Sequence, residues 1–209
     1  MPIYFKDQRA VLFVHVPKTG GTTIETLFRR AGWAQRLRET RETNPRLMDV
    51  RRCSPQHYHA AVLQELFDPG RFDAVFLMVR EPLARFRSEY IMRHVRDPRS
   101  DAASVDAWAT RLLARRREDP YVLDNHLRPQ HEFVLPGAEV YRLETGIEAI
   151  VADLNARFDL GLATQVPLIQ SSARRAGVPS SQVQLSDELL RELGELYAED
   201  FGRFGYPHP

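Results

Sequence analysis

The sequence lacks the features that mark secreted, disulfide-stabilised and membrane-spanning proteins. Cys53 is the single cysteine among 209 residues, which excludes an intramolecular disulfide and a cysteine-based metal site. The sequence has no apolar run long enough for a membrane span and no signal-peptide core. We therefore expect a soluble, cytoplasmic protein without an integral membrane segment.

An excess of charge of one sign is also lacking. The 29 lysines and arginines balance 28 aspartates and glutamates, for a formal net charge of +1. A chain so nearly neutral has no general attraction to nucleic acid or anionic membranes, and we expect no nucleic-acid partner. Local arginine clusters, such as residues 115–117, are typical of solvated helix faces. With 43% hydrophobic and 27% charged residues, the chain is ordinary for a globular protein, and its length predicts a single domain over residues 1–209.

The most informative stretch is Ala10–Trp33, which reads AVLFVHVPKTGGTTIETLFRRAGW. Its apolar beginning, residues 11–16, predicts a buried strand that ends at Pro17, because proline cannot donate to a sheet ladder. A short loop with two adjacent glycines follows, and then the apolar spacing of a helix. Thr22 and Glu25 have the spacing of a capping box, so we expect the helix to begin after Thr22.

This strand, loop and helix predict a phosphate-binding site. Such a unit directs backbone N–H groups and the positive end of the helix dipole at one point, and glycines let the backbone approach a ligand closely. The residues expected around that point are Lys18, Thr19, Gly20, Gly21, Thr22 and Thr23. The loop is not a Walker A motif, because its lysine precedes the glycines. A plain strand–helix turn that happens to contain two glycines is the alternative.

A second buried strand, expected at residues 72–79, ends in Arg80. In a P-loop nucleotide hydrolase the comparable strand ends in an aspartate that holds Mg²⁺. Arg80 is instead a permanently charged, planar donor that suits a second phosphate. Pro82 fits the first position of the next helix, and Ser88, two turns into it, adds a hydroxyl to the same group. The alternative is that Arg80 pairs with a nearby carboxylate.

Strands alternate with helices along the chain, which predicts an α/β fold with a central parallel sheet and flanking helices. We expect a third strand at residues 139–143 and a final helix that is capped by Ser186 and continues to Phe201. Residues 34–52 are polar and rich in arginine, which predicts an exposed and partly helical excursion. Ligands of such sheets bind at the carboxyl ends of strands, so the loop around Lys18 and Arg80 are expected to face one ligand.

The two motifs resemble those of the carbohydrate sulfotransferases, the group that includes the heparan sulfate 2-O- and 6-O-sulfotransferases and the chondroitin and dermatan sulfotransferases. The segment HVPKTGGTT is similar to their 5′-phosphosulfate loop, and VREPLARFRSEY is similar to their 3′-phosphate motif R-x-P-x-x-R-x-x-S-x-Y. The positions defined by the second motif are Arg80, Pro82, Arg85, Ser88 and Tyr90. DNHLRPQ, with Leu127 in place of tryptophan, VYRLETGIEAI and LYAEDFGRFGY also resemble family segments, so the resemblance covers residues 11–206.

The resemblance implies a P-loop-kinase-like fold and a small soluble, bacterial-type enzyme. It implies PAPS (3′-phosphoadenosine 5′-phosphosulfate) as sulfonate donor, PAP as product, and a hydroxyl-bearing acceptor, a glycan or a glycosylated small molecule. Lys18 would stabilise the leaving oxygen, residues 19–23 would hold the 5′ end, and Arg80 with Ser88 would hold the 3′-phosphate. Residues 171–175 would cover the nucleotide. No metal ion is expected.

The reaction also needs a base for the acceptor hydroxyl, and histidine is the usual choice. His59 is the first choice, because the 2-O-sulfotransferases place a catalytic histidine at a similar distance before the 3′-phosphate motif. His57 is the other member of this His-x-His pair, and His15 matches a strand histidine of the 6-O enzymes. Each of the three also has a purely structural reading. Acceptor specificity is expected in residues 34–52 and 97–130.

Two other functions remain open from the sequence: a small kinase that uses ATP and Mg²⁺, and a non-catalytic module that binds nucleotides or polyanions. The missing Walker A motif and Arg80 speak against the kinase. The intact lysine loop and the candidate bases speak against the binding module. The identity of the acceptor and the oligomeric state are not predicted.

Overall fold

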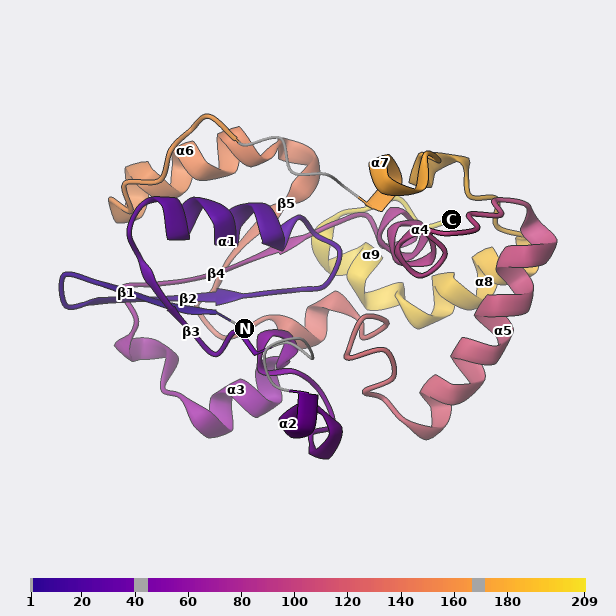
Figure 1. Cartoon of the computed structure of the whole chain (residues 1–209), viewed down its shortest axis with the longest axis horizontal. Coiled ribbons are helices and arrows are strands. Elements are labelled where there is room, and N and C mark those ends of the chain that lie inside the picture. The colour runs from indigo at the N-terminus through magenta and orange to yellow at the C-terminus, as the bar shows by residue number, and fades with distance from the viewer. Residues whose placement is uncertain (1, 40–44, 167–171) are drawn as a thin grey trace. The chain divides into compact units, whose positions relative to one another are not determined.

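The computed structural model describes residues 2–39, 45–166 and 172–209 (Figure 1). The chain forms two compact units. The first consists of Met1–Val79 and Glu132–Pro167, and the second of Arg80–His131 and Leu168–Pro209. In the described part of the chain, no helix is both long enough and apolar enough to cross a membrane.

The first unit is built on a five-stranded sheet in the order β3-β1-β2-β4-β5. The strands are β1 (Ile3–Lys6), β2 (Arg9–Val14), β3 (Ala34–Arg36), β4 (Ala74–Val79) and β5 (Glu139–Arg142). β2, β4 and β5 are parallel, with Val14 opposite Leu77 and Val79 opposite Arg142. This register puts the carboxyl ends of the three strands at one edge of the sheet, as the sequence predicts.

The sheet is mixed, because β1 pairs antiparallel with both β2 and β3. The sequence analysis predicts neither β1 nor β3. A two-residue turn joins β1 to β2, and both of its residues, Asp7 (φ 48°) and Gln8 (φ 65°), have left-handed backbone. That conformation is typical of the tight turns that match the twist of a hairpin, and glycine or asparagine usually supplies it. Because the turn contains neither glycine nor asparagine, the sequence does not indicate a hairpin here.

The helices of this unit are α1 (Gly21–Arg30), α2 (Pro45–Val50), α3 (Ala60–Leu66) and α6 (Ile147–Phe158). α1 and α6 cover one face of the sheet and α3 lies on the other (Figure 1). Buried side chains of α1 and α6, among them Phe28 and Ile150, pack on Phe13 and Phe76 of the central strands. The rings of Phe13 and Phe76 stack with their centroids 4.9 Å apart. This core fixes the strand ends from which the candidate site is built.

The excursion predicted for residues 34–52 includes β3 and the helix α2. Residues 40–44 of this stretch lie outside the described residues. The prediction of a partly helical segment is confirmed by α2, but the prediction missed the edge strand.

The second unit is helical, with α4 (Pro82–Arg93), α5 (Ala102–Glu118), α7 (Ser172–Ala176), α8 (Asp187–Leu196) and α9 (Ala198–Phe204). Pro82 occupies the first turn of α4, as expected, and the Glu81 carboxylate caps it by accepting from the N–H groups of Leu83 and Ala84. Ser186 caps α8 as predicted. The single final helix of the sequence analysis is wrong, because Tyr197 separates α8 from α9.

Candidate active site

The predicted phosphate loop joins β2 to α1. Gly20 is the N-cap of α1 and has left-handed backbone (φ 87°), as does Lys18 (φ 68°) two residues earlier. A turn of this kind points successive N–H groups into one concavity, which favours an anion. The first turn of α1 has no acidic residue, and no side chain among residues 2–39, 45–166 and 172–209 caps it. The positive end of the helix dipole and the first N–H groups of the helix therefore favour an anion at this point.

The capping box predicted for Thr22 and Glu25 is wrong. The helix begins at Gly21, one residue before Thr22, and Thr22 lies exposed in the first turn. With Gly20 as the N-cap, the third helical residue is Thr23, so Glu25 lies two positions too far along for a capping box, and its carboxylate contacts His15 instead.

The threonines of the loop have different roles. Thr19 is fully buried, and its hydroxyl donates to the carbonyl oxygen of Val16 at 2.8 Å, which holds the loop closed on itself. Thr23 is half-buried, and its backbone N–H donates to the Gly20 carbonyl at 3.0 Å. Lys18 is half-buried beside them. Thr19 thus shapes the loop through its side chain, while Lys18 and Thr22 are more exposed to solvent.

A side chain at position 21 would collide with a neighbouring ring, and this, rather than its backbone conformation, is why Gly21 must be glycine. A Cβ at this position would lie 2.4 Å from Nε2 of His15 and within 2.7 Å of two carbons of the ring. The imidazole of His15 therefore lies directly against the first residue of α1. The sequence analysis places both elements at one strand end but does not predict this contact.

We expect Gly21→Ala to lower the free energy of unfolding by about 1–3 kcal/mol, the usual cost of overpacking, because the new methyl group displaces the His15 ring. Thermal denaturation measures the effect. Gly202→Ala is the matched control, since Gly202 lies inside α9 with open space around it. Alanine there should stabilise the helix slightly. Equal melting temperatures for the two variants would contradict the contact between His15 and Gly21.

His15 is fixed by a carboxylate. Its Nδ1 lies 2.6 Å from Oε1 of Glu25, and Nε of Arg38 lies 3.3 Å from the other oxygen of that carboxylate. Burial alone would raise the pKa of Glu25, but the hydrogen bond with His15 and the positive charge of Arg38 outweigh it. The pKa of Glu25 is therefore lowered, and the carboxylate stays ionised next to the imidazole.

His57 and His59 lie in the same unit. The ring of His57 meets that of His15 edge-on, with centroids 5.4 Å apart, and its Nδ1 is 3.2 Å from the Ser54 hydroxyl. His59 is the N-cap residue of α3. All three histidines are buried, with exposed fractions of 5–8%. The structure thus brings His15 and His57 together and puts His15 against the loop.

Arg80 and Ser88 belong to the second unit. Arg80 directly follows β4, and the side-chain amide of Gln130 holds its backbone on both sides, accepting from its N–H at 2.9 Å and donating to its carbonyl at 2.7 Å. The Arg80 side chain is half-buried, as is that of Ser88 on α4. Of the segment predicted to cover the nucleotide, Ser171 lies outside the described residues and residues 172–175 form part of α7.

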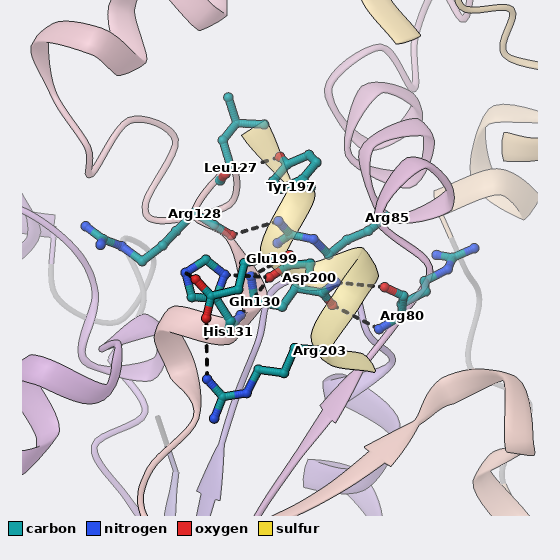
Figure 2. Close-up of polar contacts among 10 residues, drawn as sticks. All are labelled: Arg80, Arg85, Leu127, Arg128, Gln130, His131, Tyr197, Glu199, Asp200 and Arg203. Atoms are coloured by element: carbon teal, nitrogen blue, oxygen red, sulfur yellow. Dashed lines mark hydrogen bonds and ion pairs between the residues drawn. The ribbon is translucent and has the colours of Figure 1, made fainter. Parts of the chain in front are cut away.

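A buried network holds the segment 126–131 that carries Gln130 (Figure 2). The guanidinium of Arg85 donates to the carbonyls of His126 and Arg128, at 3.2 and 2.7 Å, and lies over the ring of Tyr197. Asp200 of α9 is fully buried and accepts from the N–H groups of Gln130 and His131. Arg85 of the R-x-P-x-x-R motif therefore positions a loop, and through Gln130 this loop fixes the backbone of Arg80.

Glu89 fixes the start of the same segment. Its carboxylate lies 2.6 Å from Nδ1 of His126 and 2.7 Å from Nε of Arg93. Burial would raise the pKa of Glu89, but the charges and hydrogen bonds of His126 and Arg93 lower it to about 2. Gln130, Asp200 and Glu89 are residues that the sequence analysis missed as supports. Gln130 lies in the DNHLRPQ match, Asp200 in the LYAEDFGRFGY match and Glu89 in the VREPLARFRSEY match, but none of these matches predicts the contacts.

A family model described as the sulfotransferase family matches residues 1–207, almost the whole chain. No match was found among curated proteins or among solved structures.

Proposed function

Because this chain belongs to the sulfotransferase family, we propose that it is a PAPS-dependent O-sulfotransferase that acts on a carbohydrate hydroxyl. Family membership makes it a transferase of sulfonyl groups to a hydroxyl-bearing acceptor. We propose the identity of the donor, PAPS, and the class of the acceptor, a carbohydrate. The observation that carries it is the amino end of α1, where the left-handed backbone of Lys18 and Gly20 and a first turn without acidic residues suit an anionic phosphosulfate group.

In this proposal, residues of the first unit bind the 5′ end of the nucleotide. The backbone N–H groups from Gly20 to Thr22 and the hydroxyl of Thr23 would bind the 5′-phosphate, and the ammonium of Lys18 would neutralise the charge that develops on the leaving oxygen. PAPS supplies the sulfonate that is transferred. One histidine of the group His15, His57 and His59 would accept the proton of the acceptor hydroxyl.

Arg80 and Ser88 of the second unit would bind the 3′-phosphate. The Gln130 side chain forms hydrogen bonds with both the N–H and the carbonyl of Arg80. The backbone that carries the Arg80 guanidinium is therefore held in one position. A preorganised arginine forms paired hydrogen bonds to a phosphate with little loss of entropy. This site distinguishes PAPS from nucleotides without a 3′-phosphate.

A transfer assay tests the proposed function. Purified protein with PAPS labelled in the sulfonate group is offered glycans with free hydroxyls, glycosylated small molecules and hydroxyl-bearing peptides, in the presence of EDTA. We expect label to appear on a carbohydrate. Transfer to peptides alone would contradict the acceptor class. Phosphoryl transfer from ATP and Mg²⁺, with no sulfonyl transfer to any acceptor, would contradict the donor.

A further inference from the structure

The structure assigns to Glu25 a positioning role toward His15: it holds the imidazole with its proton on Nδ1, so that Nε2, beside the phosphate loop, is the proton acceptor. This inference rests on the proposed function and deepens it, because it selects His15 among the three candidate bases. It replaces the helix-capping role that the sequence predicts for Glu25.

The first step is the direction of the hydrogen bond. The Glu25 carboxylate is ion-paired with Arg38 and can only accept, so at 2.6 Å from Nδ1 it requires a proton on that nitrogen. In a neutral imidazole the other nitrogen then has a free lone pair. Arg38 holds the second oxygen of the carboxylate, which keeps Glu25 turned toward His15.

The second step is where Nε2 lies. It is the atom that a Cβ on Gly21 would strike first, at 2.4 Å, so it lies against the first residue of α1. This is the helix end at which the proposed donor phosphate binds. A base at this point is next to the reacting sulfur. The acceptor proton passes to Nε2, the acceptor oxygen forms a bond to the sulfonate sulfur, and the bond from that sulfur to the 5′-phosphate oxygen breaks and releases PAP.

The third step concerns how firmly the pair is held. Glu25 is 4% exposed and His15 is 7% exposed. The His15 ring is stacked on Phe13, with centroids 5.5 Å apart, and His57 meets its edge. Packing on one side and the Glu25 carboxylate on the other leave the ring one orientation. A carboxylate that orients a catalytic histidine in this way contributes strongly to rate without touching substrate.

The test measures the histidine tautomer and the kinetics in the same protein. Nitrogen-15 spectra of the imidazoles should show wild-type His15 protonated at Nδ1 and free at Nε2. In Glu25→Ala the proton should move to Nε2 in part or in full, and kcat should fall about 100-fold with KM for PAPS nearly unchanged. Glu25→Gln, whose amide oxygen can still accept from Nδ1, should restore the tautomer and part of kcat. Glu65→Ala, an exposed glutamate of α3, is the matched control.

The outcomes separate this inference from the proposed function. An active wild-type enzyme whose kcat is unchanged in a folded Glu25→Ala variant would overturn the role of Glu25, as would a wild-type His15 protonated at Nε2. Loss of stability in Glu25→Ala at constant kcat would show a structural role alone and also overturn it. A wild-type protein with the expected tautomer but no sulfonyl transfer would overturn the proposed function, and with it the catalytic part of this inference.

Discussion

Replacement of Lys18 by methionine is expected to lower kcat about 100- to 1,000-fold, the usual effect of removing one preorganised donor to a leaving oxygen. Methionine keeps the length and apolar stem of lysine and removes its charge. The left-handed backbone at Lys18 stays as strained as before, so the fold should survive. Steady-state kinetics with PAPS measure the loss, and the melting temperature shows that the variant is folded.

Lys6→Met is the matched control, because Lys6 and Lys18 are the two lysines of the sequence. The ammonium of Lys6 donates to the Ala31 carbonyl at 2.9 Å, at the carboxyl end of α1. Its loss should cost stability and leave kcat nearly unchanged. Lys18→Arg keeps the charge but not the compact shape and should recover part of the activity. If Lys18→Met were as active as the wild type, the lysine would have no role at the leaving oxygen.

Replacement of Asp200 by alanine is expected to lower the free energy of unfolding by about 3–5 kcal/mol. The carboxylate is fully buried and accepts from the N–H groups of Gln130 and His131, at 2.7 and 2.8 Å, and lies 2.9 Å from Nδ1 of His131. Alanine leaves two backbone donors without their acceptor and releases Gln130 from Arg80. Chemical denaturation measures the loss, and we also expect weaker PAP binding in the variant at a temperature where it is folded.

The neighbouring residue provides the control for Asp200. The Glu199 side chain is 57% exposed and forms longer ion pairs with His131 and Arg203, so Glu199→Ala should change stability by no more than about 0.5 kcal/mol. Asp200→Asn keeps the shape and one acceptor oxygen and should fall between the two, which gives a measurable variant should Asp200→Ala fail to fold. Equal losses for Asp200→Ala and Glu199→Ala would contradict the network in Figure 2.

The sequence predicts the elements whose signals are local. The apolar run before Pro17 and the glycine loop predict β2 and α1, and Pro82 predicts the start of α4, because strand burial and proline chemistry are properties of neighbouring residues. The hairpin of β1 and β2 escapes prediction because Asp7 and Gln8 adopt left-handed backbone without the residue types that favour it.

The candidate site is predicted in part for the same reason. The loop residues share one segment, so their spacing predicts a phosphate cradle. Glu25 also lies in that segment, but the capping box and the contact with His15 are both consistent with its spacing, and only the three-dimensional structure decides between them. The support of Arg80 by Gln130 and Asp200 joins residues 50 and 70 positions apart, and no local pattern marks such contacts.

Calorimetric titration with PAP tests the central claim most directly. Wild-type protein in EDTA should bind PAP, Arg80→Ala should bind it more weakly, and Arg111→Ala, which removes an exposed arginine of α5, should bind it like the wild type. ADP with Mg²⁺ should bind far more weakly than PAP, because it lacks the 3′-phosphate. A preference for ADP with Mg²⁺, or equal affinity of PAP for wild type and Arg80→Ala, would contradict a donor site that recognises the 3′-phosphate through Arg80.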